Sequence, residues 1–532
     1  MTATFKVRYF RFGIIGRGFM QIESLENALL STVNPLLKSI IEKFDIDCER
    51  DGSLLMNSLK HFLGEEVKFC SSCRHLNHLM ANPFYRAGSR LMRVKKDFMR
   101  NKFLEHEYGD AWLKGFALMM RGIRKYGIRI PFTPAGPFEI VWNFTYSCNL
   151  RCKHCYEDAG GHRPEFTTDQ AHAAIDALSK IANIGLPALS FSGGEPLIRR
   201  DFYQVAAYAK KKIPYISIAT NGTLITKDTA KRLKDIGVDY VEISLDGATK
   251  EVHEDFRRVP GCFKKTLKGI QNCIDEGLDT CIATTAHKEN LAETPKILEL
   301  AGKLGARFMH FNYVPTGRAK QHIRLDLDPE ERLLLLEMMG KKLVDRYMKA
   351  KEEEEETGET DIRVDRVFST CPQFASVVKR LAKEKGEDYT VPAHYAAERG
   401  VEVAANFLGG CGAGRLYVGL EPNGDIKPCV FFPTNRNTVL GNILEDDFED
   451  IWDNSNLLWE LRTREKLETY RVNGHTIGCG NCRDKYICGG CRARSYSYFH
   501  GNVHGADIGC IDNEKLWEKM TNQRISESAS SH

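Results

Sequence analysis

The stretch that decides the fold is Asn143–Asp158, which reads NFTYSCNLRCKHCYED. Its three cysteines, Cys148, Cys152 and Cys155, have the spacing C-x3-C-x2-C. An apolar run, Pro137–Thr145, leads directly into this segment and predicts a buried strand. The sequence therefore places three thiols on one short loop at the carboxyl end of a strand.

Downstream of this loop, short apolar runs alternate with helical patterns. Five more strands are predicted, from the runs at residues 188–192, 215–219, 239–245, 280–285 and 307–312. Helices are predicted from a capping box at Thr167 and Gln170 and from the patterns Phe202–Lys212, Lys264–Glu276 and Leu291–Leu304. Such alternation requires parallel strands joined by crossover helices. Six units over residues 136–325 predict an α/β fold, a partial (β/α)6 barrel with its active site at the carboxyl ends of the strands.

Three thiolates on one loop suit an iron–sulfur cluster. They can hold three irons of a [4Fe–4S] cluster and leave the fourth iron without a protein ligand. That iron could then bind a substrate or a cofactor. Structural zinc sites take four ligands, so zinc fits this spacing poorly. Half a zinc site, or three cysteines placed there by chance, are the alternatives.

The motif and its place after the first strand resemble the radical S-adenosylmethionine (SAM) superfamily. In that family the open iron of the cluster chelates the amino and carboxylate groups of SAM. An electron from the cluster cleaves the sulfonium and gives methionine and a 5′-deoxyadenosyl radical, which abstracts hydrogen from the substrate. The resemblance implies a radical SAM enzyme whose cofactors are a [4Fe–4S] cluster and SAM.

Other residues match the family position by position. The sequence Ser-Gly-Gly-Glu at the end of the second strand resembles the family's GGE motif, whose glutamate and backbone hold the SAM amino group. His154 occupies a position that the family often fills with an aromatic residue near adenine. Taken without the family, a turn or a surface charge explains each of these positions. The resemblance implies SAM contacts at Ser192, Gly193, Gly194, Glu195, Thr220, Asn221, Ser244, Asp246 and Arg257.

A second group of cysteines lies near the carboxyl end of the chain. Twelve residues separate Cys411 from Gly424, four separate Gly424 from Cys429, and C-x2-C-x5-C-x2-C and a last cysteine follow. The pattern resembles the seven-cysteine SPASM extension, although two residues rather than three precede its sixth cysteine. The resemblance implies one auxiliary [4Fe–4S] cluster on Cys479, Cys482, Cys488 and Cys510 and another on Cys411, Cys429 and Cys491.

The ligand set of the second auxiliary cluster is incomplete in this interpretation. Its fourth ligand could be Cys371, another residue or a substrate atom. The competing interpretation of C-x2-C-x5-C-x2-C is a zinc ribbon. One or two auxiliary clusters are therefore expected beside the SAM-binding one.

Short phrases point to a branch of the superfamily. VWNFTYSCNLRCKHCYEDAG, Val314–Ala319 and Cys488–Tyr496 resemble enzymes that edit tetrapyrrole side chains in heme biosynthesis. The first substrate class implied is a tetrapyrrole or similar cofactor precursor. A maturase of ribosomal peptides or proteins and a lipid-modifying enzyme are the alternatives within the superfamily. A non-catalytic iron–sulfur or zinc scaffold is the alternative from another class.

Composition sets the remaining limits. The chain has 532 residues, 17 cysteines and a formal net charge of +4, which is too balanced to favour nucleic acid as a partner. No apolar run reaches about 18 residues, and Met1–Gly16 lacks the apolar segment of a secretory signal. We expect a cytoplasmic, oxygen-sensitive enzyme with a small-molecule or peptide substrate. The family chemistry implies an electron donor such as ferredoxin or flavodoxin.

The N-terminal region, residues 1–135, shows no resemblance to a known family. Residues 86–129 contain 12 Lys and Arg against four Asp and Glu, with aromatic and Met residues between them. This pattern suits an ordinary helical subdomain, a peripheral membrane surface, a carboxylate-rich substrate or another subunit. Cys70 and Cys73, with His75 and His78, are weak candidates for a metal site.

Composition shifts divide the chain into five predicted parts. These are a helix-rich region at 1–135, the barrel at 136–325, a charged helical connector at 326–405, the SPASM-like domain at 406–515 and a tail at 516–532.

Overall fold

The computed structural model describes residues 35–530, except 36, 44, 49–51, 92–95, 162, 358–366, 388 and 392–407. The expectation that Met1–Gly16 is not a signal lies outside the described residues. So do the first 34 residues of the predicted helix-rich region and most of the last part of the predicted connector, residues 392–405.

Six parallel strands form the wall of a partial barrel. They pair in chain order, each with its successor. Each coincides with one of the apolar runs, so the predicted fold class is confirmed. The strands are β3 (Glu139–Thr145), β4 (Ala188–Gly193), β5 (Tyr215–Thr220), β6 (Tyr240–Ser244), β7 (Asp279–Thr285) and β8 (Arg307–Phe311).

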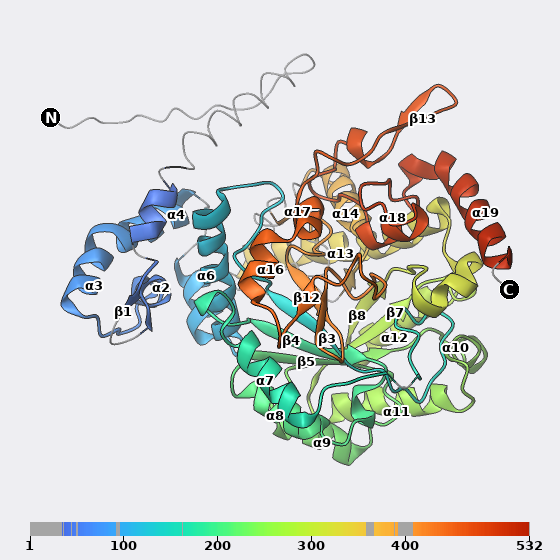
Figure 1. The fold of residues 1–532 in the computed structure, drawn as a ribbon, viewed down its shortest axis with the longest axis horizontal. Helices are drawn as coiled ribbons and strands as arrows, with labels where there is room; N and C mark the ends of the chain where they lie inside the picture. The colour runs from blue at the N-terminus through green and yellow to red at the C-terminus, as the bar shows by residue number, and fades with distance from the viewer. Residues whose placement is uncertain are drawn as a thin grey trace.

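Crossover helices cover the outside of this wall (Figure 1). The first is capped as predicted: the Thr167 hydroxyl accepts from the backbone N–H of Gln170, whose side chain accepts from the N–H of Thr167. Its buried face then packs apolar side chains onto the sheet. The helices are α7 (Thr168–Leu178), α8 (Phe202–Lys210), α9 (Lys227–Asp235), α10 (Lys250–Arg257), α11 (Cys262–Asp275) and α12 (Thr294–Leu304), with short 3-10 turns at Ile181–Asn183 and Pro196–Ile198.

The sheet continues beyond the six strands on both sides. β9 (Val367–Ser369) pairs in parallel with β8, and β10 (Tyr417–Leu420) pairs in parallel with β3. β11 (Asp425–Lys427) and β12 (Gly441–Asn442) then extend the edge in antiparallel fashion. Segments from the predicted connector and the predicted SPASM-like domain therefore belong to the same ten-stranded sheet as the barrel.

A buried charge cluster fixes the C-terminal part to the first barrel strand. The Lys427 ammonium lies 2.6 Å from the Glu421 carboxylate and 3.1 Å from that of Glu157. The Asn143 amide of β3 donates to Glu421 at 3.0 Å. Because all four side chains are buried, removing one partner would leave an uncompensated charge, which is strongly destabilising.

The connector and the C-terminal part are helical with short hairpins. Cysteines lie in the loops and turns between these elements. The predicted barrel region ends with the 3-10 segment Gly317–Leu325, and the connector contains α13 (Pro329–Thr357) and α14 (Gln373–Glu384). The C-terminal part contains α16 (Phe448–Asn454), α17 (Asn456–Arg462), β13 (Tyr470–Val472), β14 (His475–Ile477), the turn Cys479–Asn481, α18 (Arg492–Tyr498), the turn Ile511–Asn513 and α19 (Glu514–Ser530).

The N-terminal helices gather at one side of the barrel (Figure 1, blue). The buried carboxylate of Asp45 forms ion pairs with Arg121 at 2.6 Å and with Arg124 at 3.2 Å. Both arginines belong to the last turns of α6. Among the described residues, no helix is both long and apolar enough to cross a membrane. The elements are β1 (Asp47–Cys48), β2 (Gly52–Ser53), α2 (Leu54–Leu63), α3 (Ser71–Leu76), α4 (Asn82–Leu91), α5 (Lys96–Arg100) and α6 (Gly109–Tyr126), with π-helical turns at Asn77–Ala81 and Asn101–Glu105.

Candidate functional site

The loop after β3 presents three thiols whose sulfurs receive N–H groups. The backbone N–H of Leu150 lies 3.4 Å from the Cys148 sulfur, and that of Ala159 lies 3.3 Å from the Cys155 sulfur. Burial raises the pKa of Cys148 to about 12, so a thiolate there needs a nearby positive charge. Iron supplies such a charge, and hydrogen bonds to sulfur are a usual feature of cluster sites. The donor set fits a [4Fe–4S] cluster.

The middle cysteine contacts a buried arginine. Arg257, the last residue of α10, donates from Nη1 to the Cys152 sulfur at 3.5 Å. Its Nη2 lies 2.5 Å from the carboxylate of Asp246, which is fully buried beyond the end of β6. Asp246 also accepts from the backbone N–H of Thr285 at 2.8 Å. Asp246 therefore holds the guanidinium beside the cysteine loop.

Glu195 joins the ends of two strands. Its carboxylate is fully buried and accepts from the Thr220 hydroxyl at 2.8 Å and from the backbone N–H groups of Asn221 at 2.8 Å and Leu197 at 3.2 Å. Burial raises the pKa of Glu195, although these donors act in the opposite direction. In this structure the side chain connects the loop after β4 to the loop after β5.

The two glycines before Glu195 allow a close backbone approach. A Cβ on Gly194 would lie 2.1 Å from the carbonyl oxygen of Ser147, and Gly193 has a φ of +107°. The Gly194 N–H donates to the carbonyl of Thr145 at 2.7 Å. The sequence Gly-Gly at this point is therefore required for the loop after β4 to reach the loop that carries the cysteines.

A cavity of about 1430 Å³ opens beside the cysteine loop. The structure brings together most of the predicted site residues at the carboxyl ends of the strands. Glu195 and Asp246 lie behind this wall, where they hold other residues of the site. The predicted residues that line the cavity are Cys148, Cys152, Cys155, Ser192, Gly193, Gly194, Thr220, Asn221, Ser244 and Arg257. Their individual roles stay a prediction.

Aromatic rings support the cysteine loop from the side. His154 also lines the cavity and stacks on Phe256, with ring centroids 4.5 Å apart, and Phe256 stacks on His287 at 3.8 Å. Burial lowers the pKa of His154 well below its usual value, which keeps the ring neutral. A neutral, flat ring is compatible with the position that the family fills near adenine.

The C-terminal cysteines fall into two groups in space. Cys411, Cys429 and Cys491 line one small cavity of about 10 Å³. Tyr417 of β10 lines it too, and its hydroxyl lies 2.9 Å from the Cys429 sulfur. Sequence patterns did not single out Tyr417; an aromatic residue six positions after a cluster cysteine was the only available signal.

The other four cysteines are near enough to influence one another electrostatically. Burial is the largest cause that raises the thiol pKa values of Cys482, Cys488 and Cys510, and the charge of Cys479 adds to it in each. Arg492 donates a hydrogen bond to the Cys479 sulfur at 3.5 Å. This sulfur is therefore not surrounded by apolar groups alone. This grouping matches the crossed ligation implied by the SPASM resemblance, and the ligation itself stays a prediction.

The expected zinc alternatives gain no support. Within the part of the chain that the structure describes, no three His, Cys, Asp or Glu side chains are arranged to hold a single metal ion. The Cys70 sulfur instead caps α3 by accepting from the N–H of Cys73 at 3.4 Å. Thiolates of a [4Fe–4S] cluster each bind a different iron and need not converge on one point.

Cys371 lies between two residues that line the small cavity of Cys411, Cys429 and Cys491, but it does not line that cavity itself. Its neighbours Thr370 and Pro372 line that cavity, whereas Cys371 itself is fully buried in the main hydrophobic core. Burial raises the pKa of its thiol, and among the charged groups Arg494 and then Arg332 lower that pKa most. A fourth ligand, Cys371 or another group, stays a prediction.

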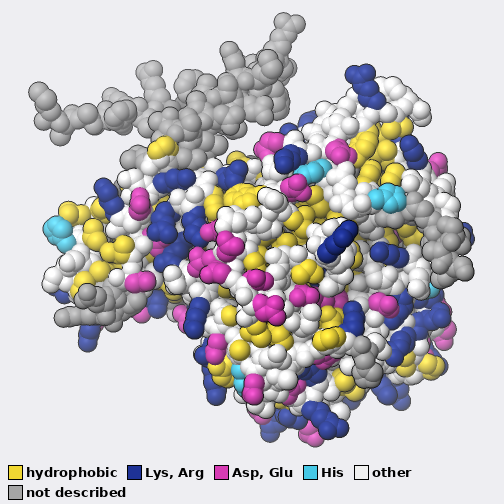
Figure 2. All heavy atoms as spheres, in the orientation of Figure 1, with side chains coloured by type: hydrophobic (Ala, Val, Ile, Leu, Met, Phe, Trp, Pro, Cys, Tyr) yellow, Lys and Arg dark blue, Asp and Glu magenta, His cyan; other side chains and the backbone are white. Residues whose placement is uncertain are grey.

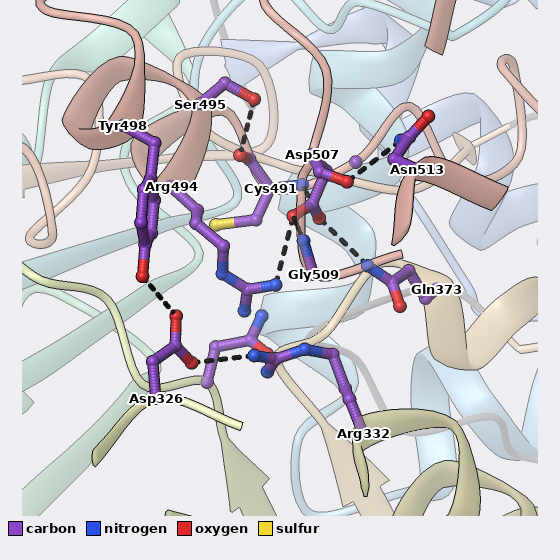
Figure 3. Close-up of polar contacts among 12 residues, drawn as sticks. Asp326, Arg332, Gln373, Cys491, Arg494, Ser495, Tyr498, Asp507, Gly509 and Asn513 are labelled. Atoms are coloured by element: carbon purple, nitrogen blue, oxygen red, sulfur yellow. Dashed lines mark hydrogen bonds and ion pairs between the residues drawn. The ribbon is translucent and has the colours of Figure 1, made fainter. Parts of the chain in front are cut away.

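A polar network joins α18, the helix that follows Cys491, to the barrel region (Figure 3). Asp507 accepts from the backbone N–H of Cys491 at 2.8 Å and pairs with Arg494 at 3.0 Å. Arg494 is the main charge that lowers the pKa of Asp507, against the effect of burial. Nearby, Asp326 pairs with Arg332 at 2.7 Å. Tyr498 of α18 donates to Asp326 at 3.0 Å, which joins the helix that follows Cys491 to the segment beyond the barrel.

Comparisons with known proteins agree with this geometry. Residues 142–301 match the radical SAM superfamily, and residues 411–492 match an iron–sulfur cluster-binding domain, SPASM. The chain is 34% identical over 367 residues to an AdoMet-dependent heme synthase of Methanosarcina barkeri, which covers 68% of this chain and 93% of the relative. It is 29% identical over 386 residues to the mycofactocin maturase MftC of Mycobacterium tuberculosis, covering 70% of this chain and 83% of the relative.

A solved structure shares the fold. SuiB of Streptococcus suis bound to S-adenosylmethionine superimposes with a TM-score of 0.53 at 16% identity, covering 83% of this chain and 90% of SuiB. The cofactors follow from the domains: a SAM-binding [4Fe–4S] cluster, SAM and auxiliary iron–sulfur clusters. The chain belongs to the radical SAM superfamily and carries a SPASM domain.

Proposed function

We propose that this enzyme cleaves SAM reductively and abstracts hydrogen from an organic substrate held inside the barrel. One observation carries the proposal: three N–H-bonded thiols lie at the same end of one cavity as Ser192–Gly194, Thr220 and Arg257. When bound, the cluster supplies the electron that converts SAM into methionine and the 5′-deoxyadenosyl radical. The chain's own residues bind SAM and the substrate, orient them and exclude water from the cavity.

Each group of residues has a proposed role. Cys148, Cys152 and Cys155 are the cluster ligands. Ser192, Gly193, Gly194, Thr220, Asn221, Ser244 and Arg257 contact SAM from the cavity wall. Glu195 and Asp246 act as positioning residues in the absence of SAM, since each is occupied by protein donors. Glu195 also remains the proposed partner of the SAM ammonium.

The auxiliary ligands follow the two groups in space. We propose one [4Fe–4S] cluster on Cys479, Cys482, Cys488 and Cys510 and a second on Cys411, Cys429 and Cys491. The proposed electron donor is a ferredoxin or flavodoxin, and the compartment is an anaerobic cytoplasm. The balanced net charge of +4 supports the proposal that nucleic acid is not a partner.

The substrate class is supported from two directions. The heme synthase relative supports a tetrapyrrole precursor, and the maturase relative supports a peptide. The apolar cavity favours a second candidate function, the modification of a lipid. Contact of residues 86–129 with an anionic membrane surface would suit that candidate.

Anaerobic reconstitution tests the cluster end of the cavity. The parent should carry about 12 irons per chain and form 5′-deoxyadenosine from SAM with dithionite. Replacing Cys148, Cys152 and Cys155 by Ala should remove about four irons and abolish this reaction. Cys70→Ser, which alters a helix cap, is the matched control and should do neither. A triple variant that still cleaves SAM would contradict the proposed function.

A further inference from the structure

The cavity does not stop at the cluster end but runs the whole length of the barrel. Its wall is formed by alternate residues of successive strands, which face the same side because side chains alternate along a strand. In closed barrels of similar construction, large branched side chains fill this space. Here many inward positions are small: Ala188, Ser190, Ser217, Ala219 and Ala283.

Beyond the amino ends of the strands, the same cavity enters the N-terminal helices. α6 contributes one continuous face, with Trp112, Phe116 and Met119 at helical spacing. α4 contributes Phe84 and Tyr85. The two ends of the cavity are therefore a cysteine loop at one side and a pocket of aromatic and Met side chains at the other.

One helical glycine shows how open the channel is. Gly115 lines the cavity in the middle of α6, and a Cβ built on it would meet no heavy atom within 4 Å. Glycine inside a helix is less favourable than alanine. A glycine that weakens its helix and faces empty space suggests that something else occupies that space.

The wall of the channel is mostly apolar. The charged side chains that line it include the acids Glu139 and Glu242, which face it from β3 and β6, and the cations Lys102 and Arg257 at its two ends. Burial raises the pKa of Glu139 to about 7 and that of Glu242 to about 8. Arg307, at the amino end of β8, is already paired with Asp279 at 2.7 Å. An apolar chain suits the apolar part of these walls, where a carboxylate would be buried without a partner.

We propose that the channel binds the long hydrocarbon chain of a lipid, with one carbon of the chain presented to the cluster end. The inference rests on the proposed function of that end and names its substrate class. The described N-terminal helices line the apolar pocket, and Figure 2 shows Lys and Arg side chains on the face of these helices in view. An anionic lipid surface would be attracted to that part of the molecule.

Binding of a fluorescent fatty acid to the reconstituted holoenzyme tests the channel. Dansylaminoundecanoic acid should bind saturably, and hexadecanol should displace it. Gly115→Leu should weaken binding about tenfold or more, because its side chain fills space that the hydrocarbon occupies. Gly302→Leu is the matched control, since it makes the same change at an exposed position of α12 with nothing within 4 Å.

The outcomes separate this proposal from the proposed function. Both glycine variants should retain their iron and their slow SAM cleavage with dithionite, which also shows that they fold. Ser217→Leu, in the middle of the barrel, should block the probe in the same way. Binding of the probe to Gly115→Leu and Ser217→Leu with the parent's affinity would overturn the channel. Displacement of the probe by coproporphyrin but not by hexadecanol would overturn it in favour of a tetrapyrrole.

Discussion

The guanidinium of Arg257 donates to the sulfur of Cys152 at 3.5 Å. Both side chains are buried, and the acid Asp246 on the far side of the guanidinium is fully enclosed. Burial acts to lower the pKa of Arg257, but Asp246 and Cys152 together raise it above its ordinary value. The arginine therefore stays charged next to a cluster ligand, where it can act on both the ligand and a bound anion.

Arg257→Gln should lower the reduction potential of the SAM-binding cluster. Loss of a nearby positive charge makes the addition of an electron less favourable, and hydrogen bonds to the sulfurs set the same potential. SAM binding should also weaken, because a charge-assisted hydrogen bond contributes about 1.5–3 kcal/mol. Redox titration followed by electron paramagnetic resonance, together with SAM binding by equilibrium dialysis, measures the two effects.

Arg258→Gln is the matched control for that experiment, since Arg258 is the next residue and is exposed. It should leave the potential and the SAM affinity unchanged. If Arg257→Gln kept both parent values, Arg257 would be only a structural residue.

Glu195→Gln should loosen the two strand ends that Glu195 connects. The amide keeps one acceptor oxygen and replaces the other by a donor, which then faces the N–H of Asn221 or the hydroxyl of Thr220. A buried donor left without an acceptor costs about 1–3 kcal/mol. We expect a lower unfolding temperature and at least about tenfold weaker SAM binding. Addition of SAM should restore less stability in this variant than in the parent, as calorimetry can show.

Gln170→Ala, which removes half of an exposed capping box, is a control for general loss of stability. It should lower the unfolding temperature slightly and leave SAM affinity intact. Equal SAM affinity in Glu195→Gln and Gln170→Ala would remove Glu195 from the SAM site.

Hydrophobic pattern was enough to predict the six barrel strands, because each is an apolar run between helical or turn segments. Other elements carry weaker signals. α9 has the sequence KDTAKRLKD and buries only Ala230 and Leu233, so its apolar face is too narrow to detect. β9 and β10 have three and four residues, and each becomes a strand only because a barrel edge is there to pair with it.

Motif spacing predicted which residues gather at the site but not which way each one faces. Ser244 lines the cavity, whereas Asp246, two residues later, is enclosed behind it. The chain leaves β6 at Ser244, so strand alternation no longer applies at Asp246. The channel itself could not be predicted, since it depends on small residues from separate strands and on helices with no resemblance to a known family.

Stability should fall as pH rises through the pKa values of the two interior carboxyl groups. The pKa of Glu242 is raised from 4.5 to about 8, chiefly by burial and further by Glu139. The folded state therefore holds this proton more tightly than the unfolded state between these pH values. By linkage, the contribution of Glu242 to the free energy of unfolding is fully present below about pH 4.5 and is lost as pH rises through about 8.

Glu242→Gln keeps the size of the side chain and removes its charge. The parent should unfold at a lower temperature at pH 8.5 than at pH 6, and the variant should lose part of that difference. Glu445→Gln, at an exposed position, should behave as the parent does. Scanning calorimetry at both pH values decides the matter, and an identical pH dependence in Glu242→Gln would show that Glu242 ionises freely in the fold.

Cys371→Ser should leave the iron content of the Cys411, Cys429 and Cys491 cluster unchanged. Cys371 packs in the main core, where burial raises the pKa of its thiol, and the charge that acts on it most strongly is Arg494 rather than another cysteine. The fourth iron would then be free for a non-cysteine ligand or a substrate atom. Iron analysis and the cluster's paramagnetic resonance spectrum provide the measurement, with Cys429→Ser as the comparison that should disturb both. A loss of about four irons in Cys371→Ser would instead make the cluster fully protein-ligated and exclude direct binding of substrate to it.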